Sequence, residues 1–294
     1  MLSESNLFMA PSHLLWRFSL LLWLAFVLHL PTMAQSTANP QVSILSDCFD
    51  MPPLDTCRRI WLYLPTDYDT SGDRYPVLYL LDGQNIFDDA TSYIGEWHVD
   101  ESLFRMEQGG FSGIIVVAID HGGPHRVAEY TPWPHPVHQG GEGARTIDFL
   151  VHYLKPYIDE HFFTLPDPEH TGIMGASLGG LMAMAAGFTH PETFGLVGAL
   201  STSYWWSEAC YDLAEAHPAG FPYRIFLSTG TREGKGQLRA TMRMASILQE
   251  AGLPPEAVTL RRVRHKNHNE KNWSKAFPEA VAWFFPDRLA RQRP

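Results

Sequence analysis

The sequence has few basic residues. Its 294 residues include 22 Lys and Arg against 32 Asp and Glu, for a formal net charge of −10, and no basic cluster stands out. Such a chain has no electrostatic attraction to a phosphate backbone, so we expect no nucleic-acid partner. Internal repeats and low-complexity tracts are also absent. With 45% hydrophobic and 18% charged residues, the composition is typical of one globular, enzyme-sized domain.

The apolar stretch near the N-terminus is short for a transmembrane span. Phe18 to Leu30 is almost purely apolar, follows Arg17, and leads into small residues ending at Ala34. This pattern predicts a secretory signal in residues 1–34, with 35–294 forming a single domain. The alternative is an uncleaved membrane anchor, because the segment before the apolar run is long and weakly basic. No cysteine for lipid attachment follows the run. Either way, we expect an exported, periplasmic or secreted protein.

Cysteine is scarce, with three residues in the chain. Export permits disulfides. Cys48 and Cys57 flank a turn-rich segment between two strand-like runs, so we expect a bridge between them. Cys210 is left over and is expected to be a buried thiol or to bond to a partner outside the sequence, because its neighbours do not resemble a thiol active site.

Strand-like and helix-like patterns alternate along the chain. An opening antiparallel pair is predicted at 42–45 and 59–64, and runs such as 76–81 and 113–119 are apolar at every position, as in strands buried on both faces. Further strands are predicted at 171–174, 196–200, 224–228 and 258–263, and helices at 95–107, 142–161, 178–189, 237–251 and 273–285. The alternation predicts an α/β fold with a mostly parallel central sheet covered by helices on both faces. Ligands of such sheets bind beyond the carboxyl ends of the strands.

The sequence Gly175-Ala176-Ser177-Leu178-Gly179 lies between an apolar strand pattern and a helix of small residues. This is the strand, tight turn and helix of a nucleophile elbow, in which a strained turn exposes the hydroxyl of Ser177. Glycine on either side avoids a collision with the neighbouring strand or helix. The alternative is a glycine-rich turn whose serine only caps the helix.

A serine nucleophile needs a histidine to accept its proton, and in α/β-hydrolases that histidine follows the serine in the chain. The candidates are His265 and His268, in the loop between the last predicted strand and the last helix. His268 is favoured because it lies closest to the start of the helix. The alternative that His265, His268 and Glu270 bind a metal has no further ligand cluster to support it, so we expect no metal.

The other polar groups of such a site are predicted from strand ends. Glu233 is the only carboxylate directly after the strand at 224–228 and is the predicted acid, with Asp212 as the fallback. The backbone amides of Leu178 and Gln84 are predicted to form the oxyanion hole. Gln84 follows the strand at 76–81 and Gly83, which permits a close backbone approach.

Two aromatic runs follow strand ends and are predicted to line the cleft. Trp133 lies in a proline-rich loop after Arg126, and Trp205 and Trp206 follow the strand at 196–200. Aromatic walls suit flat acyl groups or sugars, and Arg126 would contact a polar substrate or fix its loop. The alternative is that these side chains only pack the loops onto the core.

Five stretches together resemble one family. They span about 59–285 and are Tyr75–Asn85, Arg126–Pro132, Gly175–Gly180, Gly230–Glu233 and His268–Glu270. With these motifs the chain resembles the "Putative esterase" branch of the α/β-hydrolases, which includes enterochelin (siderophore) esterases and feruloyl esterases. The resemblance implies Ser177 as nucleophile and His268 as base. It supports Glu233 less directly, since the acid varies in this family and some siderophore esterases use a Ser–His pair. Where the family has glycines before the histidine, this chain has Arg264, His265 and Lys266.

The sequence therefore predicts an exported serine carboxylic-ester hydrolase that needs no cofactor and forms an acyl-enzyme on Ser177. Aromatic, catecholate (siderophore) and carbohydrate-linked esters are the candidate small-molecule substrates. Two alternatives are an acyltransferase that uses the same serine and a non-catalytic binding protein on a hydrolase fold. The oligomeric state is not predicted.

Overall fold

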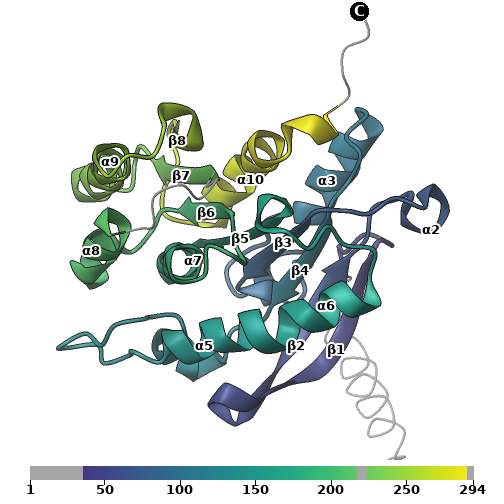
Figure 1. Cartoon of the computed structure of the whole chain (residues 1–294), viewed down its shortest axis with the longest axis horizontal. Coiled ribbons are helices and arrows are strands. Elements are labelled where there is room, and N and C mark those ends of the chain that lie inside the picture. Colours follow the sequence, from purple (N-terminus) through teal and green to yellow (C-terminus); the bar gives the residue numbers. More distant parts are fainter. Residues whose placement is uncertain (1–35, 217–223, 290–294) are drawn as a thin grey trace, which may run out of the picture. The chain divides into compact units, whose positions relative to one another are not determined.

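An eight-stranded sheet organises the part of the chain that this computed structural model describes, residues 36–216 and 224–289 (Figure 1). The strands lie in the order β1-β2-β4-β3-β5-β6-β7-β8. Strands β3 to β8 are parallel, whereas β2 is antiparallel to both β1 and β4. The bounds are β1 (Val42–Met51), β2 (Thr56–Tyr63), β3 (Val77–Leu81), β4 (Ile115–Ile119), β5 (Thr171–Ala176), β6 (Leu196–Leu200), β7 (Arg224–Gly230) and β8 (Val258–Val263). The predicted α/β fold is confirmed.

Helices cover both faces of this sheet. The helices of the described residues are α2 (Tyr68–Ser71), α3 (Val99–Gln108), α4 (Arg126–Glu129), α5 (Gly143–Phe149), α6 (Lys155–His161), α7 (Leu178–Thr189), α8 (Ala209–Glu215), α9 (Lys235–Glu250) and α10 (Glu270–Phe284). Leu80 of β3 packs with Leu103 of α3 and with α10 on one face. Its neighbour Tyr79 packs with Ile158 of α6 and Leu181 of α7 on the other. Because successive side chains of a strand alternate between faces, β3 must be apolar throughout.

Several elements differ from the sequence prediction. The helix predicted over 142–161 is divided by a π-helical turn at Leu150–Leu154. Pro156, at the start of α6, has no amide hydrogen, and its ring would clash with the carbonyl of the preceding helical turn, so the wider turn accommodates it. Helix α10 begins at Glu270 instead of Trp273. Helix α3 begins at Val99 instead of residue 95, and helices α2, α4 and α8 are absent from the sequence prediction.

The cysteines are arranged as expected. A disulfide joins Cys48 in β1 to Cys57 in β2. Cys210 is a buried free thiol that donates a hydrogen bond to the carbonyl of Ser207 at 3.0 Å. Burial raises the pKa of the Cys210 thiol to about 12. A thiol of that kind is unreactive.

The predicted signal segment, residues 1–34, lies outside the described residues. In the part of the chain that is described, no helix is both long enough and apolar enough to span a bilayer.

Replacing both Cys48 and Cys57 with serine should lower the free energy of unfolding by about 2.5 kcal/mol, since the bridge closes a short loop in the unfolded chain. Its ends are nine residues apart. Urea unfolding of the two proteins measures this difference. Dithiothreitol should destabilise the wild type by a similar amount and leave the double variant unchanged. Equal stability of the oxidised wild type and the variant would contradict the prediction.

Candidate active site

The turn at Ser177 joins β5 to α7 with backbone angles that serine rarely adopts, φ 59° and ψ −118°. A Cβ on Gly175 would lie 2.5 Å from the backbone of Gly179, so only glycine fits there. The Ser177 amide donates to the carbonyl of Leu200 at 2.9 Å, which ties the turn to β6. Such strain costs about 1–3 kcal/mol and persists only where the surrounding structure imposes it. The structure thus has the strand, strained turn and helix that the motif predicts.

The loop before α10 places His268 beside Glu233, from the turn after β7. His268 Nδ1 lies 2.8 Å from Glu233 Oε2. The Glu233 side chain is 1% exposed and that of His268 is 42% exposed, so a buried carboxylate orients an accessible imidazole. His265 is exposed, and its amide donates to Thr231 Oγ1 at 2.9 Å. Of the two histidines considered, His268 is therefore the one hydrogen-bonded to the predicted acid.

Three further residues position Glu233, and the sequence patterns did not indicate them. Glu233 Oε1 accepts hydrogen bonds from Ser201 Oγ at 2.7 Å and from Asn272 Nδ2 at 2.8 Å. The indole of Trp273 donates to Ser201 Oγ at 3.0 Å, and its ring meets that of His268 edge to face at 5.3 Å between centroids. Ser201 directly follows β6, and its place at a strand end was the available signal. No sequence signal pointed to Asn272, because it lies within a helix.

Ser177 and His268 line the same cleft, which has a volume of about 820 Å³. Its wall also includes Asp82, Gln84, Asn85, Tyr93, Ile94, His121, Arg126, Glu270 and Trp273. The hydroxyl of Ser177 contacts a second serine, with 3.1 Å between its Oγ and Ser203 Oγ. The cleft thus gathers residues from the ends of several strands, as the parallel sheet predicts.

The two amides predicted for the oxyanion hole lie at the start of helical turns. Leu178 is the first residue of α7, and Gln84 is in the 3-10 turn Gly83–Asn85. Within the described residues, neither amide donates a hydrogen bond to another protein group. A Cβ on Gly83 would lie 2.7 Å from the backbone of Ile119, so glycine allows this turn to pack closely on the end of β4.

Arg126 lies in the cleft wall, where its guanidinium forms an ion pair with the Asp82 carboxylate. Nε and Nη2 of Arg126 donate to the two carboxylate oxygens of Asp82 at 2.6 and 2.8 Å. Asp82 has φ 63°, and its amide donates to the Tyr130 hydroxyl at 3.0 Å. Burial alone would lower the pKa of Arg126, but the attraction of Asp82 outweighs it, so the pKa is raised. Arg126 thereby holds the turn that carries Gln84.

Burial also shifts the pKa values of two other titratable groups of the cleft. It lowers the pKa of His121, whose charged form loses hydration. It raises the pKa of Glu270, at the start of α10. Among the described residues, His265, His268 and Glu270 do not form a cluster of ligand atoms close enough to hold a metal ion.

The tryptophans predicted to bind substrate lie outside the lining of this cleft. Trp206 is 4% exposed, and its indole donates to the carbonyl of Trp133 at 2.7 Å. Trp205 is 61% exposed and lines a neighbouring depression that also includes Glu233. The aromatic residues in the cleft itself are Tyr93 and Trp273. Direct contact of the three tryptophans with substrate stays a prediction.

Residues 53–284 match the family model described as "Putative esterase". The chain belongs to this family. It is a carboxylic ester hydrolase of the α/β-hydrolase type.

Several relatives of this esterase have been sequenced or solved. Uncharacterized protein YbbA of Bacillus subtilis is 28% identical over 241 residues, covering 78% of this chain and 92% of that protein. A siderophore enterobactin esterase of Emericella nidulans is 29% identical over 160 residues, 47% of this chain and only 50% of that protein. The enterobactin esterase of Shigella flexneri superimposes with a TM-score of 0.69 at 23% identity, over 85% of this chain and 61% of that one. The BES protein of Bacillus cereus gives the same TM-score at 20% identity, over 85% of this chain and 97% of that one. These structures share the fold.

Replacing Arg126 with methionine should lower the free energy of unfolding by about 3 kcal/mol, because it leaves the buried Asp82 carboxylate without its cation. Adding Asp82→Asn should restore part of the loss. Urea unfolding of the wild type, both single variants and the double variant measures the coupling. Additive effects of the two substitutions would show that the pair is not energetically coupled.

Proposed function

We propose that this esterase is a serine hydrolase that transfers the acyl group of an ester to Ser177 and then to water. The observation that carries the proposal is the 2.8 Å contact of His268 Nδ1 with Glu233, in the cleft that Ser177 also lines. A carboxylate that accepts the Nδ1 hydrogen leaves Nε2 of the ring unprotonated. His268 Nε2 is then the base that accepts the serine proton.

The proposed reaction has two half-reactions. Ser177 Oγ bonds to the carbonyl carbon as its proton passes to His268, and the proton then goes to the leaving alcohol. A water molecule, deprotonated by His268, attacks the resulting ester and releases the acid and Ser177. Because the hydroxyl of Ser177 contacts Ser203 in the free enzyme, it must turn toward His268 when substrate binds. Catalytic hydrogen bonds are commonly completed only in the substrate complex.

Negative charge develops on the carbonyl oxygen in both half-reactions. We assign its stabilisation to the amides of Leu178 and Gln84, which have no protein acceptor within the described residues. The positive end of the α7 dipole adds to this effect. Donors held in place before the reaction stabilise the transition state without reorganising. The Asp82–Arg126 pair supports catalysis by holding the turn that carries Gln84.

We propose esters with an aromatic or catecholate group as the substrate class. Tyr93 and the largely buried Trp273 line the cleft, and an exposed ring such as that of Tyr93 can stack on flat groups. Relatives named as siderophore esterases, and a ferulic acid esterase with TM-score 0.62, support this choice. Trp205 is suitably placed to contact the outer part of a large substrate from the neighbouring depression. Trp133 and Trp206 would support that surface from below.

We further propose that the protein is exported, with residues 1–34 as its signal. The support is the apolar run between Phe18 and Leu30 and the small residues that end at Ala34. The Cys48–Cys57 disulfide agrees with an oxidising compartment, where such bridges form and persist.

The catalytic assignment predicts the kinetics of four variants with p-nitrophenyl acetate and butyrate. Ser177→Ala and His268→Ala should each lower kcat by about 10⁴-fold or more. Glu233→Gln should lower it by about 10³- to 10⁴-fold, because the imidazole loses its orienting carboxylate. His265→Ala is the matched control and should retain wild-type activity, with circular dichroism confirming the fold of each variant. Activity that survives His268→Ala but not His265→Ala would make His265 the base.

The substrate assignment predicts a preference between matched esters. The ethyl ester of N-(2,3-dihydroxybenzoyl)serine should have a kcat/KM about 10-fold above that of the ethyl ester of N-acetylserine. A difference of this size corresponds to one good aromatic contact. Tyr93→Ala should reduce this ratio without changing kcat for the acetyl ester. Ethyl ferulate and an acetylated sugar would test the feruloyl and carbohydrate alternatives. Faster turnover of short alkyl esters than of every aromatic ester would overturn the substrate class while leaving the serine mechanism intact.

A further inference from the structure

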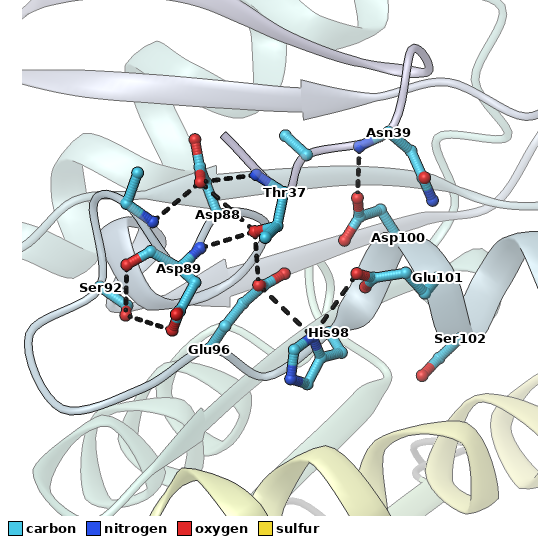
Figure 2. A network of polar contacts seen from close by, with 12 residues as sticks. Thr37, Asn39, Asp88, Asp89, Ser92, Glu96, His98, Asp100, Glu101 and Ser102 are labelled. Carbon is cyan, nitrogen blue, oxygen red and sulfur yellow. Dashed lines mark hydrogen bonds and ion pairs between the residues drawn. The ribbon is translucent and has the colours of Figure 1, made fainter. Parts of the chain in front are cut away.

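A second group of titratable side chains lies at the start of α3, outside the proposed catalytic residues (Figure 2). His98 Nδ1 is 3.3 Å from Glu96 Oε2 and 3.5 Å from Glu101 Oε1. The three ligand atoms lie within 4.8 Å of one another, the one such group of metal-ligand atoms among the described residues. Figure 2 shows the imidazole of His98 between the two carboxylates.

Negative charge in this cluster has no matching cation among the residues that the structure describes. Glu96 is 4% exposed, and Asp88 and Asp100 beside it are also buried. In the described part of the chain, no Lys or Arg forms an ion pair with these carboxylates or with Glu101, and only His98 pairs with any of them. Burying carboxylates without a counter-ion is strongly unfavourable, so the cluster requires protons or a bound cation.

A carboxylate oxygen without a hydrogen-bond donor points independently to a ligand. Oε1 of Glu96 is buried and has no hydrogen-bond partner within the described residues. The carboxyl groups of Asp100 and Glu101 lie within hydrogen-bond reach of each other. Glu96 and Asp100 are both more than nine-tenths buried. Buried acceptors are nearly always satisfied, so an acceptor left open beside a group of ligand atoms indicates a missing donor or metal ion.

The spacing of the ligand atoms suits a small transition-metal ion. Zinc binds nitrogen and carboxylate oxygen at about 2.0–2.1 Å in a tetrahedron, which separates neighbouring ligand atoms by about 3.3 Å. The two separations from His98 are 3.3 and 3.5 Å, and the two carboxylate oxygens lie within 4.8 Å of each other. An imidazole among carboxylates favours zinc over calcium or magnesium, which prefer oxygen ligands.

The surroundings supply an outer shell and an entry path. Thr37 Oγ1 donates to Glu96 Oε2 at 2.8 Å, and the Asn39 amide donates to Asp100 at 2.7 Å. Hydrogen bonds of this kind orient ligating carboxylates. Glu96 and His98 also line an open cavity of about 930 Å³, through which an ion can enter.

We propose that Glu96, His98 and Glu101 form a binding site for a divalent transition-metal ion of the zinc type, with Asp100 supporting the ligands. The ion stabilises the fold and takes no part in ester hydrolysis. It joins the segment at Thr37 and Asn39 to the start of α3. It also fixes Trp97, whose indole packs on Trp273 at 5.7 Å between centroids, beside the catalytic cleft.

The test is zinc binding by the untagged full chain after EDTA treatment and dialysis. Calorimetric titration and elemental analysis should give one zinc ion per chain, and zinc should raise the thermal unfolding midpoint. His98→Gln and Glu96→Gln should each weaken binding by about 100-fold or more, since loss of an outer-shell partner alone costs 10- to 100-fold. Neither variant should then be stabilised by zinc.

His152→Gln is the matched control. His152 is 59% exposed and faces Asp148 at 3.7 Å, while His98 is 51% exposed and faces Glu96 at 3.3 Å. The control should bind zinc like the wild type. Circular dichroism of the metal-free variants separates lost binding from lost folding, and Glu96→Gln retains shape while removing a buried charge. No saturable binding, unchanged affinity in a folded His98→Gln, or preference for calcium or magnesium would each overturn the proposal.

Discussion

The carboxylate of Glu233 receives hydrogen bonds from four groups, in its own turn, at the end of β6 and at the start of α10. They come from the Gly230 amide, Ser201 after β6, Asn272 in α10 and the ring of His268. A buried carboxylate must satisfy its acceptors, so each of these segments is held at a defined distance from the others. The position of the His268 imidazole over the cleft follows from this one group. The loop before α10 can therefore carry Arg264 and Lys266 in place of glycines without losing the orientation of the histidine.

Two turns with unusual backbone angles provide the other side of the cleft. Ser177 and Asp82 both have positive φ, and both directly follow strands of the parallel sheet. Each is held by a specific contact, Ser177 by the carbonyl of Leu200 and Asp82 by Arg126. Backbone strain persists where neighbouring structure imposes it, which ties the shape of the cleft to the stability of the sheet. The α3 cluster lies next to the same cleft, because Trp97 packs on Trp273.

Sequence patterns predicted well where one local constraint decides the outcome. The strand at Val77–Leu81 is apolar at every position because both of its faces are buried, and it forms within one residue of the predicted bounds. The 142–161 pattern is helical in period, but the effect of Pro156 depends on how the preceding turn relaxes, which periodicity does not encode. Trp206 follows a strand end, as a cleft residue would, yet its side chain turns inward to Trp133.

Local sequence features were enough to predict the fold class, the strained turn at Ser177 and the disulfide, because each depends on residues near one another in the chain or on a simple period. They also narrowed the proposed base to two histidines and offered Glu233 as the proposed acid. Packing between elements determines which histidine meets Glu233, which aromatic residues line the cleft, and that Glu96, His98 and Glu101 converge. Side-chain direction and the pairing of distant polar groups are set by packing between elements, and no local pattern specifies them.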